Sequence, residues 1–406
     1  MTRIKAAGLI LAIMFISMAF LAPPASASPS TRMESLRSYI DDQYDDVEGG
    51  YSLKAEKLSR GEPTFSVLFT LNELGDLAVR PPAINLTKAK TFLTKLQWTR
   101  IKEKEEKYGG FSSAIAVTPS VSSTYYALRA WQILSQHNDY IGMQNVEINE
   151  TAALVYLNRT YTEEGSFAAM IGEDGDIVST YMAVYSIDYL ARLIEENDGT
   201  PYQHTIDTWL NTTGVIEYIL SCRSGDGFKP APDGKVIGVT PTATAILTLS
   251  ILDRLDVLGD LQPIRDWLLA RQVTTPVADE YVGGFTESYM TNDTNLMSTY
   301  YALKALNALN SIEGHVNVTS VADFIVSCQA ADGSWALAPN APEGETTYIG
   351  IAFEAFSLLP DVNPLVLLSE EDPNNPSPPV FDWRWIAVAV PLVLALVAGI
   401  VALRLD

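Results

Sequence analysis

The chain has 406 residues, and 49 acidic against 27 basic residues give it a formal net charge of −22. Nucleic acid and anionic membrane surfaces are poor partners for such a negative field, so we expect neither as a partner of the folded body. Because 47% of the residues are hydrophobic and only 19% are charged, the composition is that of a folded protein rather than a disordered one.

The first 27 residues are laid out like a secretory signal peptide. Arg3 and Lys5 precede an apolar run at 6–22, and the small residues 25–27 follow it. We therefore predict a signal peptide over 1–27, with an uncleaved anchor as the alternative.

The C-terminal region is typical of a membrane anchor. Residues 385–403 contain no charge and are long enough to cross a bilayer as a helix, so we predict a transmembrane helix over 384–404. The preceding stretch, 361–383, is rich in proline and acidic residues and is typical of an extended stalk. Together these segments predict a single-pass protein at the cell surface, with residues 28–360 outside.

Sequons for N-linked glycosylation agree with export. The sequence contains six Asn-x-Ser/Thr acceptors, at Asn85, Asn149, Asn158, Asn211, Asn292 and Asn317.

An aromatic residue in a glycine-rich turn recurs six times at intervals of 50 to 61 residues, at Tyr51, Phe111, Phe167, Phe228, Phe285 and Trp335. A second marker follows each turn by 13 to 15 residues, at Phe65, Tyr125, Tyr181, Thr242, Tyr300 and Tyr348. Two markers in step indicate an internal repeat.

Each repeat is predicted to be a helical hairpin. Amphipathic runs precede the turns, as at 264–272 and 321–329, and apolar runs that begin with Ser or Thr follow them, as at 298–309. Six hairpins give twelve helices. An open stack would expose apolar end faces, so we predict a closed all-α (α/α)6 toroid over residues 28–360.

The two cysteines occupy the same position in repeats that are not neighbours. Cys222 and Cys328 each lie five residues before the turn glycine. In a toroid they are too far apart for a disulfide, so we predict two free, buried thiols.

The repeat resembles a known family. The stretch 324–335, FIVSCQAADGSW, is similar to the QW motif of triterpene cyclases, and the Gly-Gly-Phe loop before STYYAL at 298–303 resembles protein prenyltransferase β subunits. The resemblance covers residues 37–359. It implies an α/α toroid with inner and outer rings of helices.

The catalytic signatures of that family are missing. Protein prenyltransferases hold zinc with Asp-x-Cys and His, but the matching stretches at 296–300 and 344–348 contain neither Cys nor His. The Asp-x-Asp-Asp acid motif of triterpene cyclases is also absent. We predict no zinc site and no other cofactor, although a divalent cation held by carboxylates is possible.

Carboxylates precede three inner helices and are candidates for acid–base chemistry on an isoprenoid or a glycan. Asp176 and Glu345 are the catalytic candidates. The alternative is that these acids only stabilise helix N-termini. The full set is Glu173, Asp174, Asp176, Asp293, Glu343 and Glu345.

Four Thr-Tyr pairs begin inner helices and are candidates for lining a pocket. The alternative is packing between helices. The pairs are Thr124-Tyr125, Thr180-Tyr181, Thr299-Tyr300 and Thr347-Tyr348.

Two functions remain open from the sequence. The leading hypothesis is a membrane-anchored extracellular binding module for an apolar, isoprenoid-like ligand or a protein partner, because fold alone does not confer activity. The alternative is a prenyltransferase-like, terpene-cyclase-like or glycan-active enzyme that uses acidic residues at the mouth of the toroid.

Overall fold

The computed structural model describes residues 31–54, 58–77, 85–137, 146–275, 281–291 and 293–373. The predicted signal peptide, the predicted transmembrane helix and Asn292 lie outside these residues. Among the described residues, none of the helices combines the length and hydropathy that crossing a bilayer requires. Residues 33–370 form one compact unit, and the account below concerns that unit.

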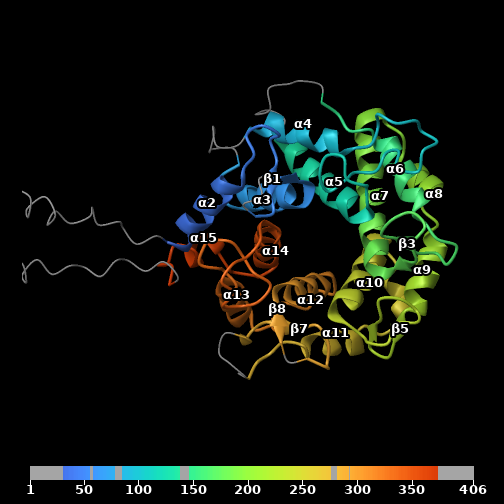
Figure 1. The fold of residues 1–406 in the computed structure, drawn as a ribbon. Helices are drawn as coiled ribbons and strands as arrows, with labels where there is room; N and C mark the ends of the chain where they lie inside the picture. Colours follow the sequence, from blue (N-terminus) through green and yellow to red (C-terminus); the bar gives the residue numbers. More distant parts are fainter. Residues whose placement is uncertain are drawn as a thin grey trace, which may run out of the picture. The chain divides into compact units, whose positions relative to one another are not determined.

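Six inner helices form a closed circle (Figure 1). Each packs against the next one along the chain, and the last returns to the first. The predicted toroid is therefore confirmed. The inner helices are α3 (Gly61–Glu73), α5 (Val121–Gln136), α7 (Ile177–Asp198), α10 (Val239–Ile251), α12 (Leu296–Ala308) and α14 (Thr346–Ser357).

An outer layer of helices surrounds this circle (Figure 1). It contains α2 (Arg32–Gln43), α4 (Leu86–Leu96), α6 (Glu150–Arg159), α9 (Thr212–Ser221), α11 (Gln262–Leu269) and α13 (Val318–Ser327). These twelve helices are the predicted ones. Three short helical segments that the repeat did not predict are α8 (Tyr202–Trp209), the 3-10 helix η1 (Leu255–Leu258) and α15 (Pro364–Leu367).

Short antiparallel strand pairs, which the sequence did not predict, brace four of the turns. They are β1 (Tyr51–Ser52) with β2 (Ser59–Arg60), β3 (Phe167–Ala168) with β4 (Gly175–Asp176), β5 (Arg223–Ser224) with β6 (Gly227–Phe228), and β7 (Phe285–Thr286) with β8 (Thr294–Asn295). Three of the pairs join a turn aromatic to the residues just before an inner helix. They hold the two ends of each of those loops together.

A belt of backbone hydrogen bonds links every repeat to the next. The first residue of each inner helix donates its N–H to a carbonyl two residues after the turn aromatic of the following repeat. The donor–acceptor pairs are Gly61–Ser113, Val121–Ala169, Ile177–Pro230, Val239–Glu287, Leu296–Leu337 and Thr346–Leu53, at 2.8 to 3.1 Å. The last pair joins repeat six to repeat one, so the same bond is made at all six junctions of the circle. All six inner-helix N-termini therefore lie at one end of the toroid, which we call the loop end.

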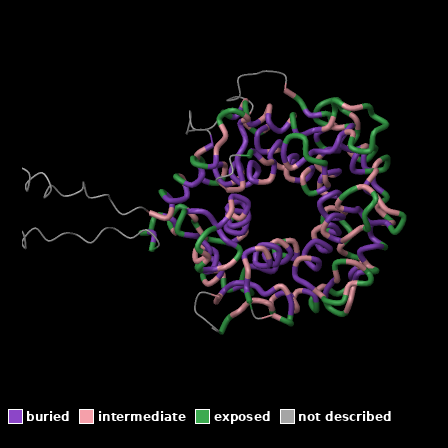
Figure 2. The backbone as a smooth tube through the Cα atoms, viewed as in Figure 1, coloured by how far each residue is buried: buried purple, intermediate pink, exposed green. Residues whose placement is uncertain are grey.

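The turn aromatics are the anchors of the core. All six side chains are at most 1% exposed, and burying each one stabilises the fold by about 2–3 kcal/mol. Figure 2 shows that buried residues line both helical layers, while exposed residues concentrate on the outer rim and in the loops. Cys222 and Cys328 are free and buried, as predicted.

Turn glycines let neighbouring repeats approach closely. Gly109 has φ +89°, and a Cβ there would lie 1.8 Å from the carbonyl oxygen of Ala152 in the next outer helix. Gly333 makes the corresponding contact that closes the toroid, where a Cβ would lie 2.2 Å from the carbonyl oxygen of Ser35. Only glycine fits both the conformation and the space.

Four of the predicted sequon asparagines are also helix caps. Each accepts a hydrogen bond on its side-chain oxygen from the backbone N–H three residues later, at the start of an outer helix. These are Asn85 at α4, Asn149 at α6, Asn211 at α9 and Asn317 at α13.

We expect Asn149→Ala to destabilise protein made without N-glycosylation by about 1 kcal/mol, because α6 loses its cap. Asn149→Asp removes the sequon equally but keeps a capping oxygen, so its cost should be near zero. Urea unfolding of the two variants measures the difference. Equal losses would show that the cap contributes nothing.

Candidate functional site

The candidate threonines hold the turns in place. The hydroxyls of Thr124, Thr180 and Thr299 accept hydrogen bonds from the backbone N–H groups of the turn aromatics in their own repeats, at 2.9 to 3.1 Å. Thr347 differs, because its carbonyl accepts a hydrogen bond from Ser66 on α3. Each of the first three hydroxyls therefore has a structural task at the loop end.

An ion pair crosses the interior of the toroid. Arg129 of α5 donates two hydrogen bonds to the Glu354 carboxylate of α14, at 3.0 and 2.8 Å. Since α3 stands between α5 and α14 in the circle, the pair links helices that are not neighbours. Both residues are in the third turn of their helices, ~12 Å from the loop end at ~1.5 Å per residue.

Three of the candidate tyrosines join this pair. Tyr300 donates to Glu354 at 2.8 Å, and the Lys304 ammonium of α12 donates to the hydroxyls of Tyr300 and Tyr181, each at 3.0 Å. Tyr125 accepts a hydrogen bond from Arg129 at 3.3 Å. We call these six side chains the lumen cluster: Tyr125, Arg129, Tyr181, Tyr300, Lys304 and Glu354.

The lumen cluster has buried tyrosines and half-buried cations, and it carries excess positive charge. Tyr125, Tyr181 and Tyr300 are only 3%, 2% and 4% exposed. Burial by itself would raise the pKa of Glu354, but the nearby Arg129 and Lys304 outweigh it and lower that pKa. One carboxylate therefore faces two cations, inside a chain whose formal net charge is −22.

Aromatic and apolar side chains surround the cluster. The Arg129 guanidinium lies 4.2 Å from the centroid of Phe65, and Tyr125 packs edge-on against Tyr185 at 5.1 Å. Phe69 and Tyr126 are half-buried and pack against Phe65, with ring centroids 5.9 and 5.7 Å apart. Both cations of the cluster therefore lie against aromatic rings.

The candidate carboxylates do not form one cluster. Asp176 caps α7, where it accepts hydrogen bonds from the backbone N–H groups of Val178 and Ser179 and from the Ser179 hydroxyl. Glu343 and Glu345 each lie 3.9 Å from the Lys54 ammonium. The three other candidates, Glu173, Asp174 and Asp293, are exposed.

A carboxyl that the sequence analysis missed lies at the loop end. Glu62 is half-buried in the first turn of α3, and its pKa is raised by burial and by the negative charge of Glu345, against the opposing effect of Arg60. The structure therefore brings Glu345 together with a second acid that tends to keep its proton. Glu62 could have been found from the sequence by its position in the first turn of an inner helix.

The residues at the position of a prenyltransferase zinc site do not fit that metal. Ser298 donates to Glu287 at 2.7 Å, and Thr240 of the preceding repeat donates to the same carboxylate at 2.9 Å. Cys222 and Cys328 are buried at the ends of outer helices. Among the described residues, no three His, Cys, Asp or Glu side chains are grouped to hold a metal ion.

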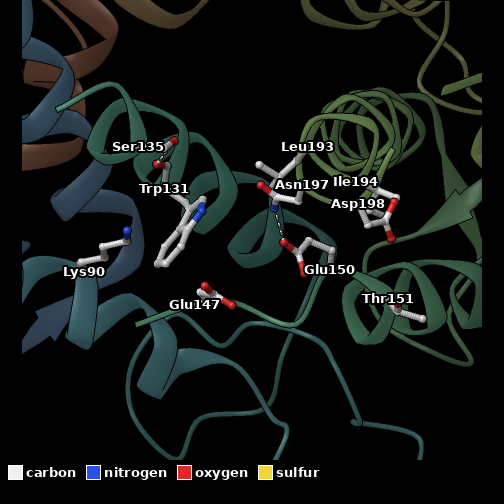
Figure 3. Close-up of a pocket in the computed structure, with 10 residues that line it drawn as sticks. All are labelled: Lys90, Trp131, Ser135, Glu147, Glu150, Thr151, Leu193, Ile194, Asn197 and Asp198. Carbon is white, nitrogen blue, oxygen red and sulfur yellow. Dashed lines mark hydrogen bonds between the residues drawn. The ribbon is translucent and has the colours of Figure 1, made fainter. Parts of the chain in front are cut away.

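A separate cavity of about 440 Å³ lies outside the inner circle, among α4, α5, α6 and α7 (Figure 3). Trp131 projects into it with the Lys90 ammonium 4.7 Å from its centroid. On the opposite side Asn197 donates to Glu150 at 2.9 Å. The cavity is polar and unrelated to the candidate residues from the sequence.

Comparisons with known proteins agree with this geometry. The model of the prenyltransferase alpha-alpha toroid domain matches residues 87–278 and 277–370, which is more than half of the chain. The chain therefore belongs to the prenyltransferase alpha-alpha toroid family.

Individual relatives are distant. The β subunit of geranylgeranyl transferase type-2 from Saccharomyces cerevisiae is 28% identical over 159 residues, which are 39% of this chain and only 45% of the yeast protein. Protein geranylgeranyltransferase-I from Candida albicans, solved with GGPP, has a TM-score of 0.58 at 17% identity and covers 89% of this chain and 95% of its own. A type II terpene cyclase from Scytonema has a TM-score of 0.49 at 12% identity, with coverages of 82% and 98%. At these identities the structural likeness concerns the fold.

Proposed function

We propose that this protein is a membrane-anchored, glycosylated extracellular member of the family that binds an isoprenoid-like ligand inside its toroid. The predicted signal peptide and transmembrane helix support the location. The lumen cluster supports the ligand, because the aromatic side chains around it suit a hydrocarbon chain and two cations against one carboxylate suit an anionic head group.

Binding without zinc-dependent transfer is the activity that these residues favour. The stretches 296–300 and 344–348 lack zinc ligands, and Ser298 is already bonded to Glu287. The Candida relative is solved with GGPP, so an isoprenoid diphosphate is the natural first probe. The charged groups of the lumen cluster, Arg129, Lys304 and Glu354, lie ~12 Å from the loop end, which is the depth that a head group would have to reach.

We expect geranylgeranyl diphosphate to bind the detergent-purified full chain at least ten-fold more tightly than geranylgeraniol, which lacks the anionic head. Lys304→Met should remove most of this preference, because it deletes an ammonium from the lumen cluster. Lys107→Met changes an exposed lysine and should leave the preference intact. Isothermal titration measures the preference in the wild type and in both variants. If the wild type binds neither compound, the proposal is overturned.

A second candidate function rests on Glu62. A half-buried carboxyl with a raised pKa beside Glu345 is suited to donate a proton. Mass analysis of the ligand recovered from the same titration distinguishes the two functions. Conversion that is lost in Glu62→Gln indicates an enzyme, and unchanged ligand indicates a binding module.

A further inference from the structure

The loops at the loop end carry exposed apolar side chains in every repeat. The six loops run from the turn aromatic to the inner helix, at 51–60, 111–120, 167–176, 228–238, 285–295 and 335–345. Eight of the eleven large apolar side chains that are exposed among the described residues belong to these loops. We call them the apolar crown: Leu58, Ile115, Val117, Met170, Val236, Tyr289, Met290 and Leu337.

This concentration differs from the scattered apolar exposure of ordinary surfaces. Every repeat contributes at least one member, and the belt of backbone hydrogen bonds places all six loops at the same end. The strand pairs β1–β2, β3–β4 and β7–β8 join the two ends of three of the loops. At least one member of the apolar crown from every repeat therefore lies at the loop end.

The charge on these loops indicates what kind of partner could bind there. In sequence they contain nine acidic and five basic residues, for a net charge of −4. The loops of repeats three, five and six hold seven of the acids and no Lys or Arg. The most exposed crown members, Tyr289 at 65% and Met290 at 69%, lie in one of these acidic loops with the exposed carboxylate of Asp293.

We propose that the apolar crown is the docking surface for a polypeptide partner that presents apolar side chains interspersed with Lys and Arg. The net negative charge of these loops disfavours an anionic membrane and a second copy of this chain, which carries the same net charge. A basic amphipathic segment satisfies both the apolar side chains and the carboxylates around them. This surface is separate from the lumen cluster.

Three synthetic peptides of equal length test the proposal on the detergent-purified full chain. The first peptide is an amphipathic helix with Leu on one face and Lys on the other. In the second peptide Glu replaces each Lys, and in the third Ser replaces each Leu. Fluorescence anisotropy should show the Leu/Lys peptide binding at least ten-fold more tightly than the other two. Equal binding of the Leu/Lys and Ser/Lys peptides would overturn the proposal, because net charge alone would explain the affinity.

Matched variants locate the binding. Tyr289→Ser/Met290→Ser should weaken the Leu/Lys peptide at least ten-fold, whereas Leu365→Ser/Val366→Ser removes two adjacent exposed apolar residues of α15 and should not. Equal effects of the two double variants would place the contact elsewhere.

Two further outcomes would assign the crown to another occupant. They are self-association in ultracentrifugation that Tyr289→Ser/Met290→Ser abolishes, and binding to phosphatidylserine vesicles that the same variant abolishes. Lys304→Met should leave peptide binding unchanged. Failure of the isoprenoid proposal can therefore be told apart from failure of the peptide-docking proposal.

Discussion

Glu354→Gln is expected to destabilise the toroid by about 3–5 kcal/mol, because it leaves the Arg129 guanidinium buried without its carboxylate. The pair is almost inaccessible, with side chains 11% and 8% exposed. The carbonyl oxygen of Gln can still accept a hydrogen bond, but the NH2 group that replaces the other carboxylate oxygen cannot accept from Arg129 or Tyr300. Urea unfolding of the wild type and the variant measures the free-energy difference.

Two controls separate burial from charge. Asp256→Asn breaks the exposed pair with Arg254 and should cost no more than about 1 kcal/mol. The double variant Arg129→Met/Glu354→Leu removes both buried charges and should recover most of the loss of Glu354→Gln. A double variant as unstable as the single one would mean that the ion pair itself stabilises the fold.

The same pair gives the wild type a pH signature. The folded-state pKa of Glu354 lies below its ordinary value of 4.5, so the unfolded chain takes up the proton first. The stability contributed by this carboxylate is therefore present above about pH 4.5 and is lost as the pH falls through the folded pKa. The double variant should show a shallower loss of stability over that acidic range.

Gly109→Ala should destabilise the protein by more than about 4 kcal/mol, which is exceptional for a single methyl group. The left-handed backbone accounts for only about 1–2 kcal/mol. The remainder comes from the contact with Ala152, where a Cβ would lie 1.8 Å from the carbonyl oxygen and force the repeats apart. Urea unfolding measures the loss, and failure to accumulate as folded protein counts as the same result.

Gly172→Ala is the matched control for this substitution. Gly172 has φ +88°, almost the same as Gly109, but a Cβ there would meet nothing within 4 Å. We expect it to cost only the backbone term of about 1–2 kcal/mol. If the two variants lose equal stability, the approach of neighbouring repeats does not explain the turn glycines.

The repeat pattern predicted the architecture because both of its markers have local physical causes. An aromatic after a glycine turn is buried in every repeat, and the apolar run that follows is an inner helix. Closure followed from the absence of a polar end repeat, and the contacts of α14 with α3 confirm it. The two-residue strands were missed, since pairs that short leave no periodicity in the sequence.

The candidate residues were harder to interpret, because the same residue type serves different tasks at equivalent positions. Asp176 stood out as an acid before an inner helix, and it is a helix cap. Tyr125, Tyr181 and Tyr300 were found by their repeat position, but their hydrogen-bond partners were not. Glu62 passed unnoticed in the first turn of α3.

By itself, the sequence determined the number of repeats and their helical hairpins, because both depend on residues close together in the chain. Only the tertiary structure decided that Arg129 meets Glu354 across 225 positions and that Lys304 meets Tyr181 across 123. These contacts depend on the rotation of each inner helix and on closure of the circle, and neither is encoded in a local pattern. The lumen cluster and the apolar crown therefore depend on the assembly of the repeats, although the repeat pattern had already marked three tyrosines of the cluster.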